Sequence, residues 1–259
     1  MRICLYPDHS IFMPSTEQTP THRIRSFIRR QGRITQGQQL ALECHWDKYC
    51  LDPAVDYDFS QVFGRTAPLI VEIGFGTGDS LAKMAAANPE NDYIGIEVHR
   101  PGVGHLMLLL DQQGLTNVRI YCHDAIEIIE CKIADNSLAG VHLFFPDPWP
   151  KKKHHKRRIV RPSFVDLLVR KLQPGGYFHA ATDWQNYAEH MLEILSAGAG
   201  LGNTSPTGDY CERPEYRPLT RFEQRGLRLG HGVWDLIFKK KMKPILIQCL
   251  YDRFRATRE

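Results

Sequence analysis

The sequence predicts an α/β protein built on a doubly wound, mostly parallel sheet. Short apolar runs alternate with helical stretches along the middle of the chain, as expected for a parallel sheet with helices on both faces. A glycine-rich turn at residues 74–78 follows the first run, and acidic residues stand at or just after the ends of five runs. Because ligands of such sheets bind at the carboxyl ends of the strands, these acids are expected to share one functional edge.

The strands are predicted from apolar, β-branched runs that are bounded by turn-forming residues. They cover residues 68–73, 92–97, 118–122, 141–145, 177–182 and 233–238. The first run is apolar throughout except for Glu72, which is the pattern of a strand buried on both faces. The acids that accompany the strand ends are Glu72, Glu97, Asp124, Asp147 and Asp183. A single acid in such a place is usually a helix cap or a solvated turn, but five along one edge are hard to explain as caps alone.

The helices are predicted from the spacing of apolar residues and from start and stop residues. They cover residues 79–87, 102–113, 164–172 and 184–195. The motif Pro174-Gly175-Gly176 is expected to stop the third helix, and the turn formers of residues 198–208 indicate a loop.

The chain has 259 residues, which suits either one large α/β domain with an extension or two small domains. We expect a disordered leader (residues 1–21), a basic N-terminal extension (22–65), the main domain (66–245) and a C-terminal tail (246–259). No apolar run approaches the roughly 18 residues that a membrane span requires, and acids and prolines interrupt the first 20 residues where a signal peptide would be apolar. The seven scattered cysteines indicate reduced thiols in a cytoplasm rather than a disulfide framework or zinc site.

The positive charge of the chain is concentrated in two segments. Residues 22–33 hold five arginines and no acid, and residues 151–161 hold seven lysines and arginines and no acid. The net charge is only +4, so the remainder of the chain is acidic overall. Concentrated basic segments on an acidic body favour a polyanionic partner such as nucleic acid. The alternative is a solvated face that only aids solubility.

One acid stands in an unusually constrained place. Residues 144–150 read Phe-Phe-Pro-Asp-Pro-Trp-Pro, and the second basic segment follows directly. Each proline fixes its own φ and restricts the residue before it to extended conformations, so Asp147 is expected to be held in place. This arrangement indicates an enzyme that positions one carboxylate beside a nucleic acid.

The glycine turn indicates the kind of cofactor. A dinucleotide site usually reads Gly-x-Gly-x-x-Gly, but here the last fingerprint position holds Asp79, whose carboxylate would repel a pyrophosphate. A cofactor without phosphates, S-adenosylmethionine, fits better. Glu97 ends the second strand, where a ribose diol needs an acceptor, and Asp124 is well placed for the adenine amino group. Glu72 either takes part in this site or holds the turn by backbone hydrogen bonds, or does both.

Four motifs together resemble one family. They are Val-Glu-Ile-Gly-Phe-Gly-Thr-Gly at residues 71–78, Phe-Pro-Asp-Pro-Trp-Pro-Lys-Lys at 145–152, Ala-Thr-Asp at 181–183 and Thr-Arg-Phe-Glu at 220–223. With flanking stretches they resemble, over about residues 22–240, the bacterial tRNA (guanine-N7-)-methyltransferases of the TrmB family. The resemblance implies a class I S-adenosylmethionine-dependent methyltransferase fold of the Rossmann-like type, and methylation of guanine 46 in the tRNA variable loop.

The resemblance also implies roles for individual residues. Asp147 is expected to be catalytic and to bind the cofactor. The other implied cofactor contacts are Glu72, Gly74, Gly76, Gly78, Glu97 and Asp124. The implied substrate contacts are Lys151, Asp183, Thr220, Arg221, Phe222 and Glu223. The implied RNA contacts are Lys153, His154, His155, Lys156, Arg157 and Arg158. The expected partner is tRNA, without a metal, a membrane or an obligate protein partner.

Guanine N7 carries a free lone pair and no proton, so methyl transfer to it requires no general base. Acids are still useful, because a carboxylate accepts hydrogen bonds from guanine N–H groups and stabilises the positive charge that develops on the purine. Asp147, Asp183 and Glu223 are the candidates. Two alternatives remain: methylation of another nucleic-acid base, and a catalytically silent RNA-binding protein.

Overall fold

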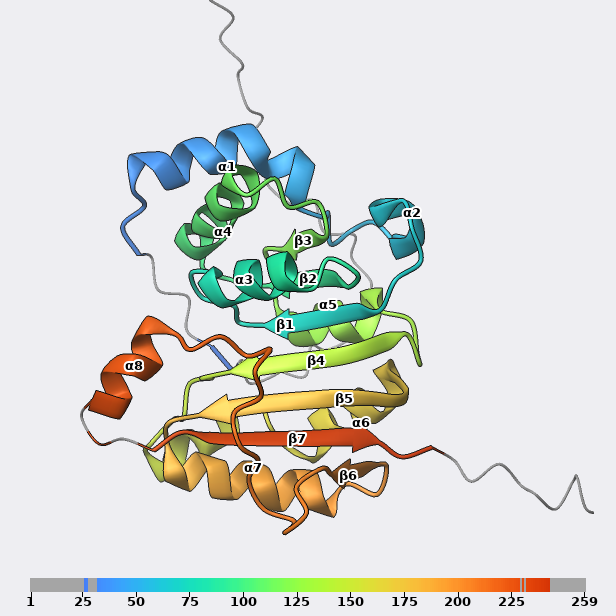
Figure 1. Cartoon of the computed structure of the whole chain (residues 1–259), viewed down its shortest axis with the longest axis vertical. Coiled ribbons are helices and arrows are strands. Elements are labelled where there is room, and N and C mark those ends of the chain that lie inside the picture. Colours follow the sequence, from blue (N-terminus) through green and yellow to red (C-terminus); the bar gives the residue numbers. More distant parts are fainter. Residues whose placement is uncertain (1–25, 28–31, 229, 231, 243–259) are drawn as a thin grey trace, which may run out of the picture.

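The computed structural model describes residues 26–27, 32–228, 230 and 232–242, with only the backbone of residues 221, 222, 225 and 227 (Figure 1). The predicted leader and C-terminal tail lie outside the described residues. Of the five arginines of the first basic segment, only Arg33 lies within them. The predictions for these parts of the chain therefore stay predictions.

The centre of the molecule is a seven-stranded sheet with the order β3-β2-β1-β4-β5-β7-β6 (Figure 1). The strands are β1 (Leu69–Ile73), β2 (Asp92–Ile96), β3 (Val118–Tyr121), β4 (Leu138–Phe144), β5 (Leu172–Thr182), β6 (Leu201–Asn203) and β7 (Trp234–Lys240). Strands β1 to β5 are parallel, whereas β7 runs antiparallel to both β5 and β6. The strand order reverses between β1 and β4, which is where ligands of doubly wound sheets bind.

Helices cover both faces of the sheet. They are α1 (Gln36–Tyr49), α2 (Phe59–Phe63), α3 (Asp79–Ala87), α4 (Arg100–Gln112), α5 (Ala125–Lys132), α6 (Pro162–Lys171), α7 (Gln185–Ala197) and α8 (Arg221–Arg228), with a 3₁₀ helix, η1, at Lys152–Arg157. Alternate strand residues face opposite sides. One core therefore joins the sheet to α5, α6 and α7, and the other joins it to α1, α3 and α4.

The predicted doubly wound, mostly parallel fold is confirmed, and all six predicted strands are present with shifted ends. Two predictions about the chain were wrong. Residues 201–203 form β6 inside the predicted loop, because they pair with β7. Pro174-Gly175-Gly176 lies within β5, since α6 ends at Lys171 and continues directly into the strand. Leu138 pairs with Leu172 but Gly140 pairs with Tyr177, so the residues between bulge out of the ladder.

Besides β6, five elements were not predicted: α1, α2, α5, η1 and α8. Helix α1 begins with a capping box, in which the Thr35 hydroxyl accepts from Gln38 N–H and the Gln38 side chain accepts from Thr35 N–H. Its spacing of apolar residues is weak, and only Ala41, Leu42 and Tyr49 are buried, which explains why periodicity did not reveal it.

Candidate active site at the carboxyl edge of the sheet

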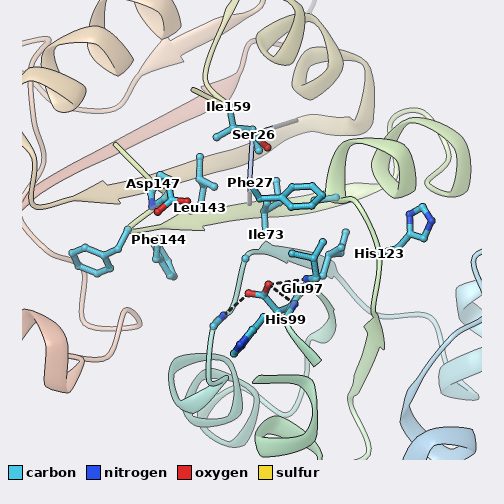
Figure 2. A pocket seen from close by; sticks show the side chains of 17 residues that line it. Ser26, Phe27, Ile73, Glu97, His99, His123, Leu143, Phe144, Asp147 and Ile159 are labelled. Atoms are coloured by element: carbon cyan, nitrogen blue, oxygen red, sulfur yellow. Dashed lines mark hydrogen bonds between the residues drawn. The ribbon is translucent and has the colours of Figure 1, made fainter. Parts of the chain in front are cut away.

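A cavity of about 480 Å³ lies at the carboxyl ends of the central strands (Figure 2). Its volume is within the usual range for small-molecule sites. Figure 2 shows Glu97 and His99 from the end of β2 on one side, and Asp147 from the turn after β4 on another. The lining residues are Ser26, Phe27, Ile73, Gly74, Gly76, Ile96, Glu97, Val98, His99, His123, Ala125, Leu143, Phe144, Phe145, Pro146, Asp147 and Ile159.

The glycine turn opens its backbone toward this cavity. Gly74, Gly76 and Gly78 all have positive φ, at 69°, 61° and 79°, which favours glycine. A Cβ on either of the first two would meet nothing within 4 Å, whereas a Cβ on Gly78 would lie 2.7 Å from the Leu106 side chain. Gly74 and Gly76 therefore leave room for a ligand against bare backbone, and Gly78 allows the turn to pack on α4.

Glu97 is locked by the backbone around it. Its Oε1 accepts hydrogen bonds from Val98 N–H and His99 N–H at 2.7 and 3.0 Å, and its Oε2 accepts one from Gly76 N–H at 3.0 Å (Figure 2). The glycine turn and the end of β2 are thereby joined through a single carboxylate. A carboxylate has about four lone-pair positions, so one remains available to a ligand hydroxyl.

Glu72 is buried under the turn, with 2% of its surface exposed. Its Oε2 has no hydrogen-bond partner among the described residues. Burial, and then the nearby Glu97 charge, raises the pKa of Glu72 to about 8. The described residues thus give no support to the alternative in which Glu72 holds the turn by backbone hydrogen bonds. Glu72 is not among the residues that line the cavity, although the next two residues, Ile73 and Gly74, are.

Asp124 begins α5 as its N-cap. Its Oδ1 accepts from Ile126 N–H at 2.9 Å and from Glu127 N–H at 3.4 Å. The residues on either side of it, His123 and Ala125, line the cavity, but Asp124 is not among the lining residues. The predicted contact of Asp124 with adenine is untested, and its visible role is to start the helix.

Asp147 is exposed and lines the cavity. Two non-glycine residues with positive φ bracket it, Phe145 at 51° and Trp149 at 47°. Such strained backbone persists only where the surroundings enforce it. Phe145 N–H donates to the Ala181 carbonyl at 2.7 Å, and Arg158 Nε donates to the Pro148 carbonyl at 3.0 Å. The turn is therefore braced from β5 and from the basic segment. The prediction that each proline makes the residue before it extended was wrong for Phe145 and Trp149, which precede Pro146 and Pro150, because these contacts hold the backbone at positive φ.

The second basic segment forms η1 immediately after this turn. Lys151, Lys153 and Lys156 are exposed, whereas His154, His155 and Arg157 are half-buried. The expectation of a surface RNA contact does not suit Arg158, which is only 3% exposed. Its guanidinium is directed inward because it bonds the Pro148 carbonyl and the Asn186 side chain and lies 4.8 Å from the Tyr187 ring centroid. Arg158 therefore stabilises the Asp147 turn from the protein interior, through its bond to Pro148.

Of the predicted substrate contacts whose side chains are described, Lys151, Asp183, Thr220 and Glu223 are not among the lining residues of the cavity. Asp183 is half-buried just after β5, and Thr220 caps α8 by accepting from Glu223 N–H at 3.1 Å. Glu223 is only 3% exposed, and both of its oxygens accept from Arg217. The side chains of Arg221 and Phe222 lie outside the described parts of α8.

Ser26 and Phe27 are lining residues that were not predicted. The Trp149 indole N–H donates to the Ser26 carbonyl at 3.1 Å, which holds this segment next to the Asp147 turn. A Cβ on Gly32 would lie 2.5 Å from His99 Nε2, so the same segment also packs closely on the end of β2. These residues belong to the upstream stretch of the family resemblance, but nothing in their chemistry predicts a place in the cavity.

Within the described residues, no group of three or more His, Cys, Asp and Glu side chains is arranged to hold a metal ion. No helix in the same part of the chain is long and apolar enough to cross a membrane.

The strand order with an antiparallel β7, the glycine turn after β1 and the acid at the end of β2 define the class I S-adenosylmethionine-dependent methyltransferase fold. Solved structures agree. A 16S rRNA methyltransferase, KamB, matches with a TM-score of 0.54 at 16% identity, over 73% of this chain and 95% of its own. An antibiotic-resistance methyltransferase, Kmr, matches with a TM-score of 0.50 at 14% identity, over 74% and 94%. At these identities the likeness shows the fold alone.

The family follows from sequence relatives. A family model described as "Putative methyltransferase" matches residues 66–236. A tRNA (guanine-N(7)-)-methyltransferase of Alcanivorax borkumensis is 57% identical over 220 residues, which are 85% of this chain and 92% of that protein. The protein of the same name from Aeromonas hydrophila is 58% identical over 219 residues, 84% and 92% of the two chains. The chain belongs to the tRNA (guanine-N7-)-methyltransferase family.

Proposed function

We propose that this protein transfers a methyl group from S-adenosylmethionine to N7 of guanine 46 in the variable loop of tRNA. The observation that carries the proposal is the place of Asp147, on a braced turn between the cavity at the glycine turn and the exposed lysines of η1. A single carboxylate there faces a small-molecule site on one side and a polyanion-binding surface on the other. Family membership supports the same activity.

The residues around the cavity suit S-adenosylmethionine. Glu97 keeps a lone pair for a ribose hydroxyl, and the backbone at Gly74 and Gly76 leaves space that a side chain would fill. Glu72, buried and without a partner for Oε2, suits the ammonium of the methionine part. The bound molecule supplies an electrophilic methyl group on a sulfonium.

The protein's own contribution is positioning and electrostatics. Holding guanine N7 in line with the methyl group converts a bimolecular reaction into one between fixed partners, and this accounts for much of the rate of such transfers. The Asp147 carboxylate opposes the positive charge that forms on the purine, and its fixed turn avoids reorganisation. The base must be unstacked to reach the cavity, and the basic segment supplies phosphate contacts that stabilise this arrangement.

The chain's organisation follows from this proposal. Residues 66–245 form the methyltransferase domain, and residues 22–65 form an extension that adds basic charge for tRNA and, through Ser26 and Phe27, part of the cavity wall. We infer a cytoplasmic enzyme that uses tRNA as its partner and requires no metal and no obligate protein partner. Residues 1–21 and 246–259 have no part in this proposal.

The function is tested by incubating unmodified tRNA with the protein and S-adenosylmethionine, then digesting the RNA to nucleosides. We expect 7-methylguanosine, and none from a matched tRNA in which guanine 46 is replaced by adenosine. A different methylated nucleoside would support methylation of another base. Tight tRNA binding without any methylated product would indicate a silent RNA-binding protein. Either result would overturn the proposal.

We expect S-adenosylmethionine binding to release a proton from Glu72. With a pKa of about 8 this carboxyl is about nine-tenths protonated at pH 7, and a bound ammonium favours the ionised form. The release should therefore approach one proton at pH 7 and vanish above about pH 9. Calorimetry at pH 7 in two buffers of different ionisation enthalpy measures it. Glu72→Gln should show no release, and NAD should not bind to either protein.

The same pKa gives a ligand-free control. Between pH 4.5, the usual pKa, and about 8 the native protein holds a proton that the unfolded chain has lost, so this group makes stability fall as pH rises across that window. Glu72→Gln should remove this contribution to the decrease of stability with rising pH. Equal pH dependence in the two proteins would show that Glu72 is already ionised in the native state, and the proton-release prediction would then be wrong.

A further inference from the structure

A buried guanidinium lies between α8 and β7. Arg217 precedes α8 in the segment that crosses β7, β5 and β4 (Figure 1), and it is 1% exposed. Its Nη1 and Nη2 donate to the two oxygens of Glu223 at 2.7 and 2.8 Å. Its Nε and Nη2 donate to the two oxygens of Asp235 at 2.6 and 2.9 Å. One planar fork therefore holds two carboxylates from different elements, which a lysine ammonium cannot do with the same geometry.

The cluster formed by Arg217, Glu223 and Asp235 is held in place on the β7 side as well. Burial acts to raise the pKa of Asp235, but hydrogen bonds from His179 and Arg217 hold it below its ordinary value, so this carboxylate stays ionised. His179 Nε2 lies 2.7 Å from Asp235 Oδ1, and its Nδ1 lies 2.9 Å from the Tyr216 hydroxyl. Buried ion pairs add little net stability because desolvation offsets their attraction, but they hold their partners in one arrangement. The cluster is suited to fixing position.

Two parts of the site meet at this guanidinium. Glu223 is the third residue of α8, and its N–H is the group that Thr220 caps, so Arg217 fixes the start of the helix. In a usual Thr-x-x-Glu start the glutamate returns to the cap residue, but here both of its oxygens accept from Arg217. On the other side, the guanidinium carbon lies 5.9 Å from the Phe144 ring centroid and 5.6 Å from that of Phe145.

We propose that Arg217 is a positioning residue for methyl transfer, which joins the start of α8 to the turn that carries Asp147. Phe144 lines the cavity, and Phe145 begins the strained turn with a φ of 51°. Arg217 thus bonds the first turn of α8 through Glu223 and lies over the two phenylalanines at the start of the Asp147 turn. Its catalytic effect rests on the proposed function, but its structural effect does not.

Arg217→Lys tests the proposal, since it keeps the charge and loses the fork. We expect the single-turnover rate of methyl transfer to tRNA to fall on the order of 10²-fold, because small misplacements of reacting groups cost about this much. The affinity for S-adenosylmethionine should change less than about twofold. The matched control is Arg119→Lys on β3, a half-buried arginine that also lies over a phenylalanine, Phe63, and donates to backbone carbonyls. It should leave the rate unchanged.

A readout without tRNA separates this proposal from the proposed function. Amide hydrogen exchange of α8 should become at least about tenfold faster in Arg217→Lys, with β1 and β4 unchanged. Should that variant not fold, Asp235→Asn removes the charge and one acceptor on β7 without changing any residue of α8 or of the turn, and faster exchange of α8 is expected here too. If the wild-type protein does not methylate tRNA, the proposed function is refuted. Hydrogen exchange of α8 then still tests whether Arg217 holds the start of this helix.

A double-mutant cycle tests whether Arg217 acts through Glu223. If it does, Arg217→Lys should lower the transfer rate of a Glu223→Gln protein only slightly, because the Arg217–Glu223 ion pair is already lost there. Multiplying losses would show independent roles and overturn the proposal. So would a folded Arg217→Lys protein with the wild-type transfer rate or the wild-type exchange of α8.

Discussion

Asp147→Asn is expected to lower the single-turnover rate of methyl transfer by at least about 10²-fold, which is the usual cost of losing one preorganised electrostatic contact. The amide keeps the shape of the side chain and can still accept hydrogen bonds, so it removes only the charge. Asp147 lies on a turn held by Phe145 N–H to Ala181 and by Arg158 to Pro148, and these contacts do not involve its carboxylate. The turn should therefore survive the substitution.

Affinity for tRNA should change little, because the lysines of η1 supply the phosphate contacts. The measurement is single-turnover transfer to unmodified tRNA, with circular dichroism to check folding. Asp166→Asn is a suitable control, since Asp166 is an exposed acid on α6. If a folded Asp147→Asn protein transfers at nearly the wild-type rate, the carboxylate has only a structural role, and the catalytic contribution belongs to Asp183 or Glu223.

The strands that could be predicted most directly from sequence are β1 and β2, whose neighbours bury both of their faces. Residues 69–73 are all buried, and so are residues 92–96. A strand that is buried on both faces needs mostly apolar side chains, so such strands appear in the sequence as apolar runs. Strand β6 is three residues long and exists only because β7 lies beside it. Helix α6 was predicted, but its direct passage into β5 was not, because the bulge at residues 173–176 depends on the spacing of β4.

The same distinction holds for the site. The positions of the glycine turn, Glu97 and Asp147 at the cavity could be predicted because they depend on neighbours in sequence: a tight turn, a strand end and the turn after β4. Arg158 could not be distinguished from the lysines beside it, since its burial depends on Asn186, which is 28 residues away. Arg217 gave no signal at all. Its function comes from Asp235, 18 residues further on, and only the folded chain brings the two together.

The burial of Arg158 changes which residues should carry the electrostatic binding of tRNA. We expect Lys152→Ala, Lys153→Ala and Lys156→Ala together to reduce the log–log salt slope of tRNA binding by about 2 to 3 units, since each phosphate contact contributes about 0.9 for duplex and roughly 0.7 for single strands. These lysines are exposed on η1 directly after the Asp147 turn. Affinity for S-adenosylmethionine should stay close to the wild-type value, because none of them lines the cavity.

Two further variants make this prediction specific. Lys83, Lys239 and Lys241 are equally exposed lysines on α3 and at the end of β7, so their triple alanine variant removes the same charge elsewhere and should leave the slope nearly unchanged. Arg158→Ala should leave the slope unchanged as well but lower the melting temperature, because the Pro148 carbonyl and Asn186 lose their donor. Equal slopes for the η1 triple variant and the wild type would mean that this segment is only a solvated face, and that tRNA is held by the first basic segment instead.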